Sequence, residues 1–221
     1  MRMVIGAAFV SLDGVMQAPG GPEEDPTGGF AHGGWLFDYF DEAVGRRIDG
    51  IFAGDFDLLL GRRTYDIFAA YWPFARGENG PLGERFDRAA KYVVTRGDQR
   101  LDWRNSHRLP TLDALAQLKR GDGADLVIQG SSTLYPPLLA AGLIDRLLIM
   151  TFPVVLGAGK RLFGDGTAPR SMRLVDHEVS PGGNIVAVYE PQGEVEPGSF
   201  ATEKPSAAEL ERRDKIARGI W

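Results

Sequence analysis

Apolar residues along the chain alternate between short continuous runs and stretches with helical spacing. The first run, Met3 to Val10, is rich in β-forming residues and short enough for a strand that is buried on both faces. Strands that alternate with helices predict right-handed crossovers and a mainly parallel sheet with helices on both faces, an α/β fold. The expected strands cover 3–10, 57–60, 91–95 and 125–129, and the expected helices cover 35–52, 64–70, 112–119 and 134–141.

The pattern changes after Arg146. Apolar runs at 147–156, 172–178 and 184–189 follow one another without helices between them, and Ser180-Pro181-Gly182-Gly183 predicts a turn that joins the last two. The sheet is therefore expected to finish with antiparallel strands.

One expected helix contains an obstacle. Pro136 and Pro137 fall within 134–141, and a proline past the first turn removes a backbone hydrogen bond. We expect this helix to begin late or irregularly.

Two segments have the composition of irregular structure. Residues 17–34 are rich in Gly and Pro, and a loop of this length in a compact domain is usually functional, so we regard it as a candidate lid. Residues 190–205 are polar with three prolines, which is typical of a surface linker. We therefore expect a domain over 1–190 and an extension over 191–221.

The extension is expected to end in a helix. Ser206 and Glu209 have the spacing of a capping box, and Glu209 with Arg213 and Glu211 with Lys215 are favourable four-residue pairs. An isolated helix this short is marginal in water, so we expect it to pack on a partner subunit or beside the cleft. The apolar stripe that would pack consists of Leu210, Ala217 and Trp221, with Ile216 and Ile220 beside it.

Composition excludes several classes of function. The 221 residues include no cysteine, which rules out disulfides and thiolate chemistry, and the three scattered histidines have no metal-ligand spacing. A net charge of −5 gives no basic footprint for nucleic acid, and no run is long enough to span a membrane. We expect a cytoplasmic protein without a metal.

Three expected strands end in residues suited to phosphate binding. They are followed by Gly61-Arg62-Arg63-Thr64, Thr95-Arg96 and Gly130-Ser131-Ser132-Thr133. Ligands of open α/β sheets bind beyond the carboxyl ends of the strands, where helix amino termini offer free N–H groups. Each segment alone could be a turn or a helix cap, with Thr64 capping its helix. Together, with arginines that have no obvious other partner, they favour a phosphorylated ligand.

The same segments carry a family resemblance. LLLGRRTYDIF, KYVVTR and LVIQGSSTLY, in that order, resemble the cofactor-binding segments of dihydrofolate reductase. SLDGVMQAPGG, FAHGGW and PVVLGAGKRLF are more similar still to the bacterial dihydrofolate-reductase-like family related to the reductase domain of riboflavin biosynthesis. The resemblance covers about residues 3–190. It implies a dihydrofolate-reductase-like mixed sheet, bound NADPH and a homodimer.

The resemblance also implies roles for individual residues. Gly61 to Thr64 would hold the pyrophosphate and the adenosine 2′-phosphate, and Thr95 and Arg96 would line the 2′-phosphate. The remaining cofactor positions are Gly130, Ser131, Ser132 and Thr133 against the pyrophosphate and nicotinamide half, and Ala8, Val15 and Met16 against the nicotinamide.

Three residues are candidates on the substrate side. The resemblance puts Asp13 at the mouth of the active site and Thr151 on the strand that borders the substrate pocket. His32 could donate a proton near neutral pH. The alternatives are a turn for Asp13, a solvated loop for His32 and simple packing for Thr151. Gly157 to Lys160 lacks the other residues of a phosphate loop and predicts a turn.

These observations predict an NADPH-dependent reductase that delivers a hydride to a C=N, C=O or C=C bond of a small planar or heterocyclic substrate. One alternative is the 5-amino-6-(5-phosphoribosylamino)uracil reductase of riboflavin biosynthesis, and another is a non-catalytic NADPH-binding module. Folate is not the expected substrate, because none of Asp38, Asp41 and Glu42 aligns with the pterin-binding acid of dihydrofolate reductases.

Overall fold

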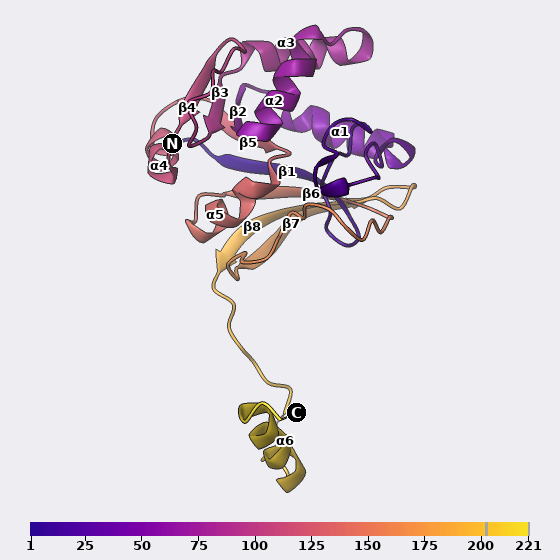
Figure 1. The fold of residues 1–221 in the computed structure, drawn as a ribbon, viewed down its shortest axis with the longest axis vertical. Helices are drawn as coiled ribbons and strands as arrows, with labels where there is room; N and C mark the ends of the chain where they lie inside the picture. Colours follow the sequence, from indigo (N-terminus) through magenta and orange to yellow (C-terminus); the bar gives the residue numbers. More distant parts are fainter. Residues whose placement is uncertain (202, 221) are drawn as a thin grey trace.

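The computed structural model describes residues 1–201 and 203–220. Within them, eight strands form one sheet in the order β4-β3-β2-β5-β1-β6-β8-β7 (Figure 1). The pairs among β1 to β6 are parallel, whereas β8 is antiparallel to both β6 and β7. The strands are β1 (Val4–Ser11), β2 (Phe56–Gly61), β3 (Lys91–Val94), β4 (Ser106–Leu109), β5 (Asp125–Gln129), β6 (Arg146–Phe152), β7 (Ser171–Val179) and β8 (Ile185–Gly193). The expected mixed, mainly parallel sheet is confirmed.

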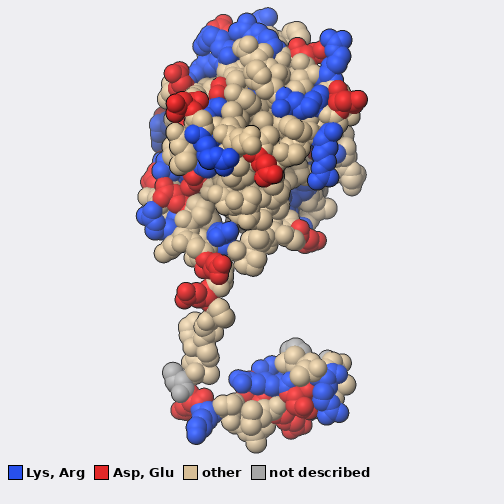
Figure 2. All heavy atoms as spheres, turned by 90° about the vertical axis from the view of Figure 1, so that its left-hand side faces the viewer, with Lys and Arg blue, Asp and Glu red and all other residues tan. Residues whose placement is uncertain are grey.

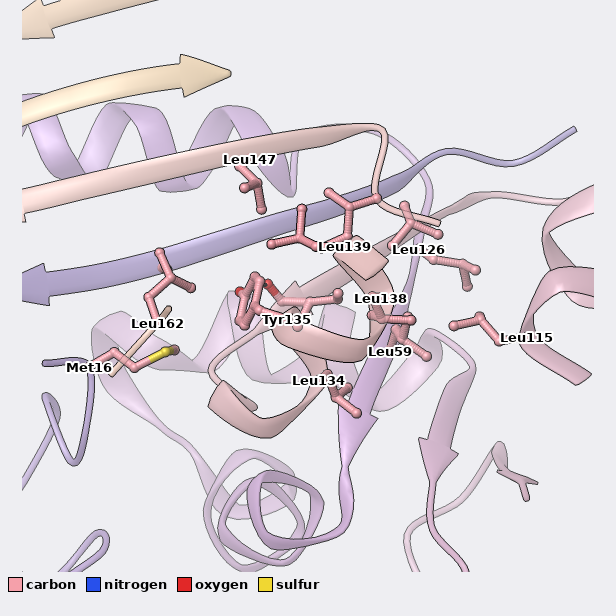
Figure 3. Packing of buried hydrophobic residues seen from close by; sticks show 14 of the residues in the cluster. Met16, Leu59, Leu115, Leu126, Leu134, Tyr135, Leu138, Leu139, Leu147 and Leu162 are labelled. Carbon is pink, nitrogen blue, oxygen red and sulfur yellow. Dashed lines mark hydrogen bonds between the residues drawn. The ribbon is translucent and has the colours of Figure 1, made fainter. Parts of the chain in front are cut away.

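Helices cover both faces of the sheet. Alternation along β5 sends Leu126 and Ile128 into the cluster packed by α4 and α5, while Val127 faces the cluster with α2 and α3. Tyr135, Leu138 and Leu139 of α5 fill the centre of the first cluster (Figure 3). The helices are α1 (Glu42–Ile51), α2 (Arg62–Tyr71), α3 (Gly80–Arg88), α4 (Leu112–Arg120), α5 (Tyr135–Ala140) and α6 (Ala207–Ala217).

The prediction of a helix over 35–52 is wrong for the residues before α1. Only a 3-10 turn forms at Phe37–Tyr39, and the chain is extended at Phe40. Asp41 then caps α1, because its carboxylate accepts a hydrogen bond of 3.1 Å from the Val44 N–H. The apolar positions before the cap instead pack as a loop, with Trp35 and Leu36 buried.

The proline pair has the expected effect on α5. A 3-10 turn (Ser132–Leu134) precedes the helix, and a proline stands within the first two positions of α5, where a backbone N–H has no intrahelical partner. The segment 130–134 therefore approaches the helix as irregular backbone, beside the candidate site.

A buried lysine joins α3 to β3, two elements of which the sequence analysis predicted only the strand. Lys91 is fully buried, and its Nζ donates to the carbonyl oxygens of Phe86, Asp87 and Ala89, each at 3.0 Å. It also lies 4.2 Å from the centre of the Trp103 ring. The ammonium thus satisfies carbonyls that the end of a helix leaves without partners.

The C-terminal extension begins later than expected. β8 continues to Gly193, which pairs with Ser171, so the sheet passes the expected boundary at residue 190. Beyond it, α6 is capped by Ser206, which accepts from the Glu209 N–H at 3.2 Å. The expected pairs of Glu209 with Arg213 and Glu211 with Lys215 are present, each at 2.8 Å.

The helix α6 lies apart from the domain at the end of an extended arm (Figure 1), and none of its residues is buried. Figure 2 shows charged residues of both signs on it. Packing on a partner subunit stays a prediction, and its part that concerns Trp221 lies outside the described residues. Among the described residues, no helix has the length and apolar character needed to cross a membrane.

Candidate active site

The carboxyl ends of the parallel strands meet at one edge of the sheet. Two of the three expected cofactor segments are hydrogen-bonded to each other there. The Gly61 N–H donates to the Ser131 Oγ at 2.9 Å, and the Ser131 N–H donates to the Thr64 Oγ1 at 3.0 Å. The ends of β2 and β5 therefore form one continuous surface.

The backbone at the end of β5 has an unusual conformation. Gly130 and Ser131 both have positive φ, 73° and 59°. A Cβ on Gly130 would lie 3.1 Å from the Thr64 Cγ2, so glycine allows this close approach. Ser132 and Thr133 continue into the 3-10 turn that follows.

Thr64 does not cap α2, contrary to expectation. The N-cap is Gly61, which has no side chain to accept a hydrogen bond, and the Thr64 hydroxyl is instead bonded to Ser131. The first turn of α2 keeps its backbone N–H groups without a side-chain cap, beside the turn at Gly130. This is the local arrangement in which helices bind phosphate.

The three arginines are not equivalent. Arg62 pairs with Asp66 at 2.8 Å and donates to the carbonyls of Gln99 and Arg100, so the expectation that it has no other partner is wrong. The spacing of four residues to Asp66 was visible in the sequence. Arg63 is half exposed, and Arg96 is exposed and has no polar partner among the described residues. Thr95 accepts from the Gly97 N–H at 3.3 Å.

Asp13 connects the turn after β1 to the loop after β6 by hydrogen bonds. Its Oδ1 accepts from the Ser11 hydroxyl at 2.6 Å and from the Leu156 N–H at 3.1 Å, and its Oδ2 accepts from the Gly157 N–H at 2.8 Å. These bonds, the Ser11 hydroxyl first, lower the pKa of Asp13 to about 2. The carboxylate therefore positions the loop after β6, and its catalytic role stays a prediction.

The other substrate-side and nicotinamide-side residues are placed as follows. His32 is exposed, with its ring 5.8 Å from that of Phe30, and Thr151 is partly buried in β6. Ala8 of β1, Val15 and Met16 are all buried. Met16 packs at the margin of the cluster around Tyr135 (Figure 3).

A cleft of about 340 Å³ opens between the long loop after β1, the turn after β6 and the start of α2. Gln17 connects the loop to the turn. Its Nε2 donates to the carbonyls of Asp25 and Thr27 in the loop, and its Oε1 accepts from the Lys160 N–H at 3.0 Å in the turn. The cleft is lined by Gln17, Thr27, Gly28, Gly29, Phe30, Arg63, Ala158, Gly159 and Lys160.

Sequence analysis missed most of these lining residues. The segment of 157–160 does form a turn, as expected, but Gly159 and Lys160 also face the cleft. The segment PVVLGAGKRLF was itself part of the family resemblance, and that was the available signal.

Gln129, the last residue of β5, was also missed. Its Oε1 is buried and has no hydrogen-bond partner in the described structure. By alternation from Val127, its side chain lies on the sheet face covered by α2 and α3. A buried acceptor without a partner is costly, so this atom is a candidate to accept a hydrogen bond from a bound ligand or a water molecule.

The three acids that were candidates for binding a pterin are either hydrogen-bonded within the protein or exposed to solvent. Asp41 caps α1 and accepts from the Asn184 Nδ2 at 2.8 Å, while Asp38 and Glu42 are exposed. Within the described residues, no group of three or more His, Cys, Asp or Glu side chains is arranged to hold a metal ion.

Several known proteins are similar to this chain in sequence or in fold. Uncharacterized protein YyaP of Bacillus subtilis (strain 168) is 26% identical over 198 residues, which cover 85% of this chain and 94% of the relative. A putative riboflavin biosynthesis protein from Shewanella sp. PV-4 has a TM-score of 0.64 at 19% identity, over 86% of this chain and 99% of that one.

Two further solved structures share this fold at lower similarity. A pyrimidine reductase-like protein from Corynebacterium diphtheriae has a TM-score of 0.57 at 13% identity, over 87% and 93% of the two chains. Dihydrofolate reductase from Enterococcus faecalis, complexed with NADP(H) and RAB-propyl, has a TM-score of 0.51 at 16% identity, over 86% and 96%. At these identities the likeness shows the dihydrofolate-reductase-like fold alone.

The family model described as the RibD C-terminal domain matches residues 2–186, which include every strand up to the start of β8 and the three segments expected to bind a cofactor. The chain therefore belongs to the RibD C-terminal domain family, a reductase-like family with the dihydrofolate reductase fold.

Proposed function

We propose that this protein is an NADPH-dependent reductase of a small planar or heterocyclic molecule with a C=N, C=O or C=C bond. The observation that carries the proposal is the hydrogen-bonded junction of Gly61, Thr64 and Ser131 at the amino end of α2. It combines uncapped helix N–H groups, glycine backbone and nearby arginines, which is the chemistry that a dinucleotide pyrophosphate requires.

The residues present fit NADPH. Gly61, Arg63 and Thr64, with Gly130 to Thr133, would hold the pyrophosphate, since the positive φ at Gly130 and Ser131 brings backbone close to the helix amino end. Arg96, which is exposed and without a partner among the described residues, would bind the 2′-phosphate beside Thr95. When bound, NADPH supplies the hydride.

The remaining residues would hold and protonate the substrate. Ala8, Val15 and Met16 are each buried and would face the nicotinamide, which would exclude water from that side. The Oε1 of Gln129, which has no partner among the described residues, would accept a hydrogen bond from a polar group of the substrate, and His32 is the candidate proton donor at the loop. Asp13 would keep the loop after β6 in place.

Stopped-flow oxidation of NADPH against a panel of pterins, pyrimidines, quinones and enones tests the proposal. We expect turnover of at least one class and weak or no turnover of dihydrofolate. Tight NADPH binding without turnover of any class would favour a non-catalytic module. Equal dissociation constants for NADPH and NADH in calorimetry would contradict the cofactor assignment.

The family match favours one specific alternative, reduction of 5-amino-6-(5-phosphoribosylamino)uracil. The panel therefore includes this ribosylamino-pyrimidine. Turnover of this compound at a kcat/KM far above those of the other classes would identify it as the substrate.

A further inference from the structure

The cleft beside Arg63 contains two cations that share one carboxylate. Lys160 Nζ is paired with Asp25 and donates to the Thr27 Oγ1 at 2.8 Å, and Arg63 lies 3.7 Å from the same Asp25 oxygen. The Asp25 side chain is only 10% exposed, whereas those of Lys160 and Arg63 are 29% and 56% exposed. The two cations therefore reach the cleft and the acid lies behind them.

The donors of this group exceed its acceptors. An ammonium has three N–H donors, and Lys160 uses two of them, on Asp25 and Thr27. Arg63 makes no hydrogen bond to the described residues, since 3.7 Å is an ion-pair distance only. One ammonium N–H and the five N–H donors of the guanidinium remain, with one net positive charge.

The cleft wall is suited to an oxyanion. Gly28, Gly29 and Gly159 line the cleft and, being glycines, place no side chain in front of their backbone; their φ values of 74°, 73° and 131° lie in the region that favours glycine. The Gly159 N–H has no hydrogen-bond partner among the described residues. Phe30 supplies an apolar surface beside these donors.

Asp25 organises this group and offsets only one of its two positive charges. Burial acts to raise its pKa, but the hydrogen bonds from Lys160 and Thr27 outweigh burial and hold the pKa below its ordinary value. Asp25 is therefore ionised at neutral pH and holds Lys160 beside Arg63. Gln17, bonded to both walls, fixes the distance between the loop and the turn.

We propose that Lys160 and Arg63 form an oxyanion subsite for a phosphate group of a bound ligand. The phosphate would come either from the cofactor, whose pyrophosphate Arg63 is proposed to hold, or from a phosphorylated substrate, in which case Arg63 would bind the substrate and not the pyrophosphate. The subsite adds to the proposed function. Only the identity of the bound ligand depends on the proposed function being correct.

Calorimetric titration of the full chain with inorganic phosphate and pyrophosphate tests the subsite. We expect saturable binding that Lys160→Met weakens at least tenfold and that Lys160→Arg restores to within about threefold. Lys204→Met removes an equal charge from the exposed arm and is the matched control, expected to leave the affinity unchanged. Asp25→Asn should strengthen phosphate binding, because it removes the competing carboxylate.

The outcomes separate the subsite from the reductase activity. No phosphate binding to the natural chain, or equal binding by Lys160→Met and Lys204→Met, would overturn the subsite even if NADPH is oxidised. If Lys160→Met unfolds, weaker binding by a folded Asp25→Asn would overturn it as well. Repeating the titration with saturating NADP+ identifies the source: loss of phosphate binding assigns the subsite to the cofactor, and retained binding assigns it to the substrate.

Discussion

Asp13 is a carboxylate whose hydrogen bonds have a measurable energy. Its pKa of about 2 in the folded chain lies below the 3.8 of an unperturbed group, so its contribution to stability is present above pH 4 and is lost as the pH falls through 2. Because the carboxylate is partly exposed and screened by solvent, the contribution to stability is about 1 kcal/mol. We expect Asp13→Asn to lower the free energy of unfolding by about that amount at pH 7, measured in urea.

The pH dependence distinguishes this explanation from a general loss of packing. The gap between Asp13→Asn and the natural chain should close between pH 4 and pH 2. A constant gap over this range would contradict the role of the charge. If kcat of the folded variant also falls by orders of magnitude, Asp13 has the catalytic role that the resemblance implies.

Arg96 and Arg62 provide a second test at single positions. Arg96 is exposed without a partner among the described residues, while Arg62 is held by Asp66. Losing hydrogen bonds to a charged group costs about 1.5 to 3 kcal/mol, so Arg96→Ala should weaken NADPH binding about tenfold to a hundredfold and leave NADH binding unchanged. Calorimetry with both cofactors and with Arg62→Ala for comparison measures this; an equal loss for NADPH and NADH would exclude a 2′-phosphate contact.

Residues of the candidate site could be proposed from the sequence only where they lay next to a strand end. Gly61, Thr64 and Ser131 were identified because each follows an apolar run. Lys160 and Asp25 were not, because 135 positions separate them and only folding brings their charges together. Gln129 was missed because an orphaned atom can be recognised only once its surroundings are known.

The junction of α3 and β3 is governed by Lys91. Burial lowers the pKa of this ammonium from 10.5 to about 8, so between these values the unfolded chain binds more protons than the folded one. Stability should then rise with pH, by up to about 3 kcal/mol. We expect the free energy of unfolding of the natural chain to rise relative to that of Lys91→Met between pH 8 and pH 10.5.

Urea unfolding of both chains over this range is the measurement, with Lys204→Met as an exposed control. A flat difference would mean that the three carbonyls keep the pKa of Lys91 near its ordinary value, against the effect of burial.

Elements with strong periodicity were predictable, whereas the start of α1 and the edge strand β4 were not. The limits of β5 matched the apolar run, since a strand buried on both faces has a clear signal. The apolar spacing over 35–52 continued past Asp41, yet the cap at Asp41 decided where α1 begins. The strand β4 reads Ser-His-Arg-Leu at the sheet edge and has almost no apolar signal.

The arm is the feature of the whole molecule that most needs a partner. Leu210, Ile216 and Ile220 of the terminal segment are exposed in the single chain. We expect α6 to pack on a second subunit, so removal of residues 194–221, which leaves β8 complete, should halve the mass in light scattering and lower the melting temperature.

Leu210→Asp should reproduce the effect of the deletion, and Arg218→Ala at the C-terminal cap of the same helix is the control. Unchanged mass, melting temperature and NADPH affinity after the deletion would show that the arm has no structural role.

The fold class could be predicted from the sequence, but the order of the strands in the sheet could not. Alternating strands and helices predicted parallel crossovers, and the final runs predicted antiparallel pairing, both confirmed. The position of β1 between β5 and β6 depends on packing across the whole domain, which local periodicity does not contain.

That central position of β1 has a consequence for biosynthesis. Ser11 pairs in register with Phe152, so 141 further residues must be translated before the first strand has both neighbours. At about 5 to 20 residues per second, this takes roughly 7 to 28 s. During this interval the apolar segment leaves the ribosome without a sheet to join, and it is the part of the nascent chain that a chaperone would have to shield.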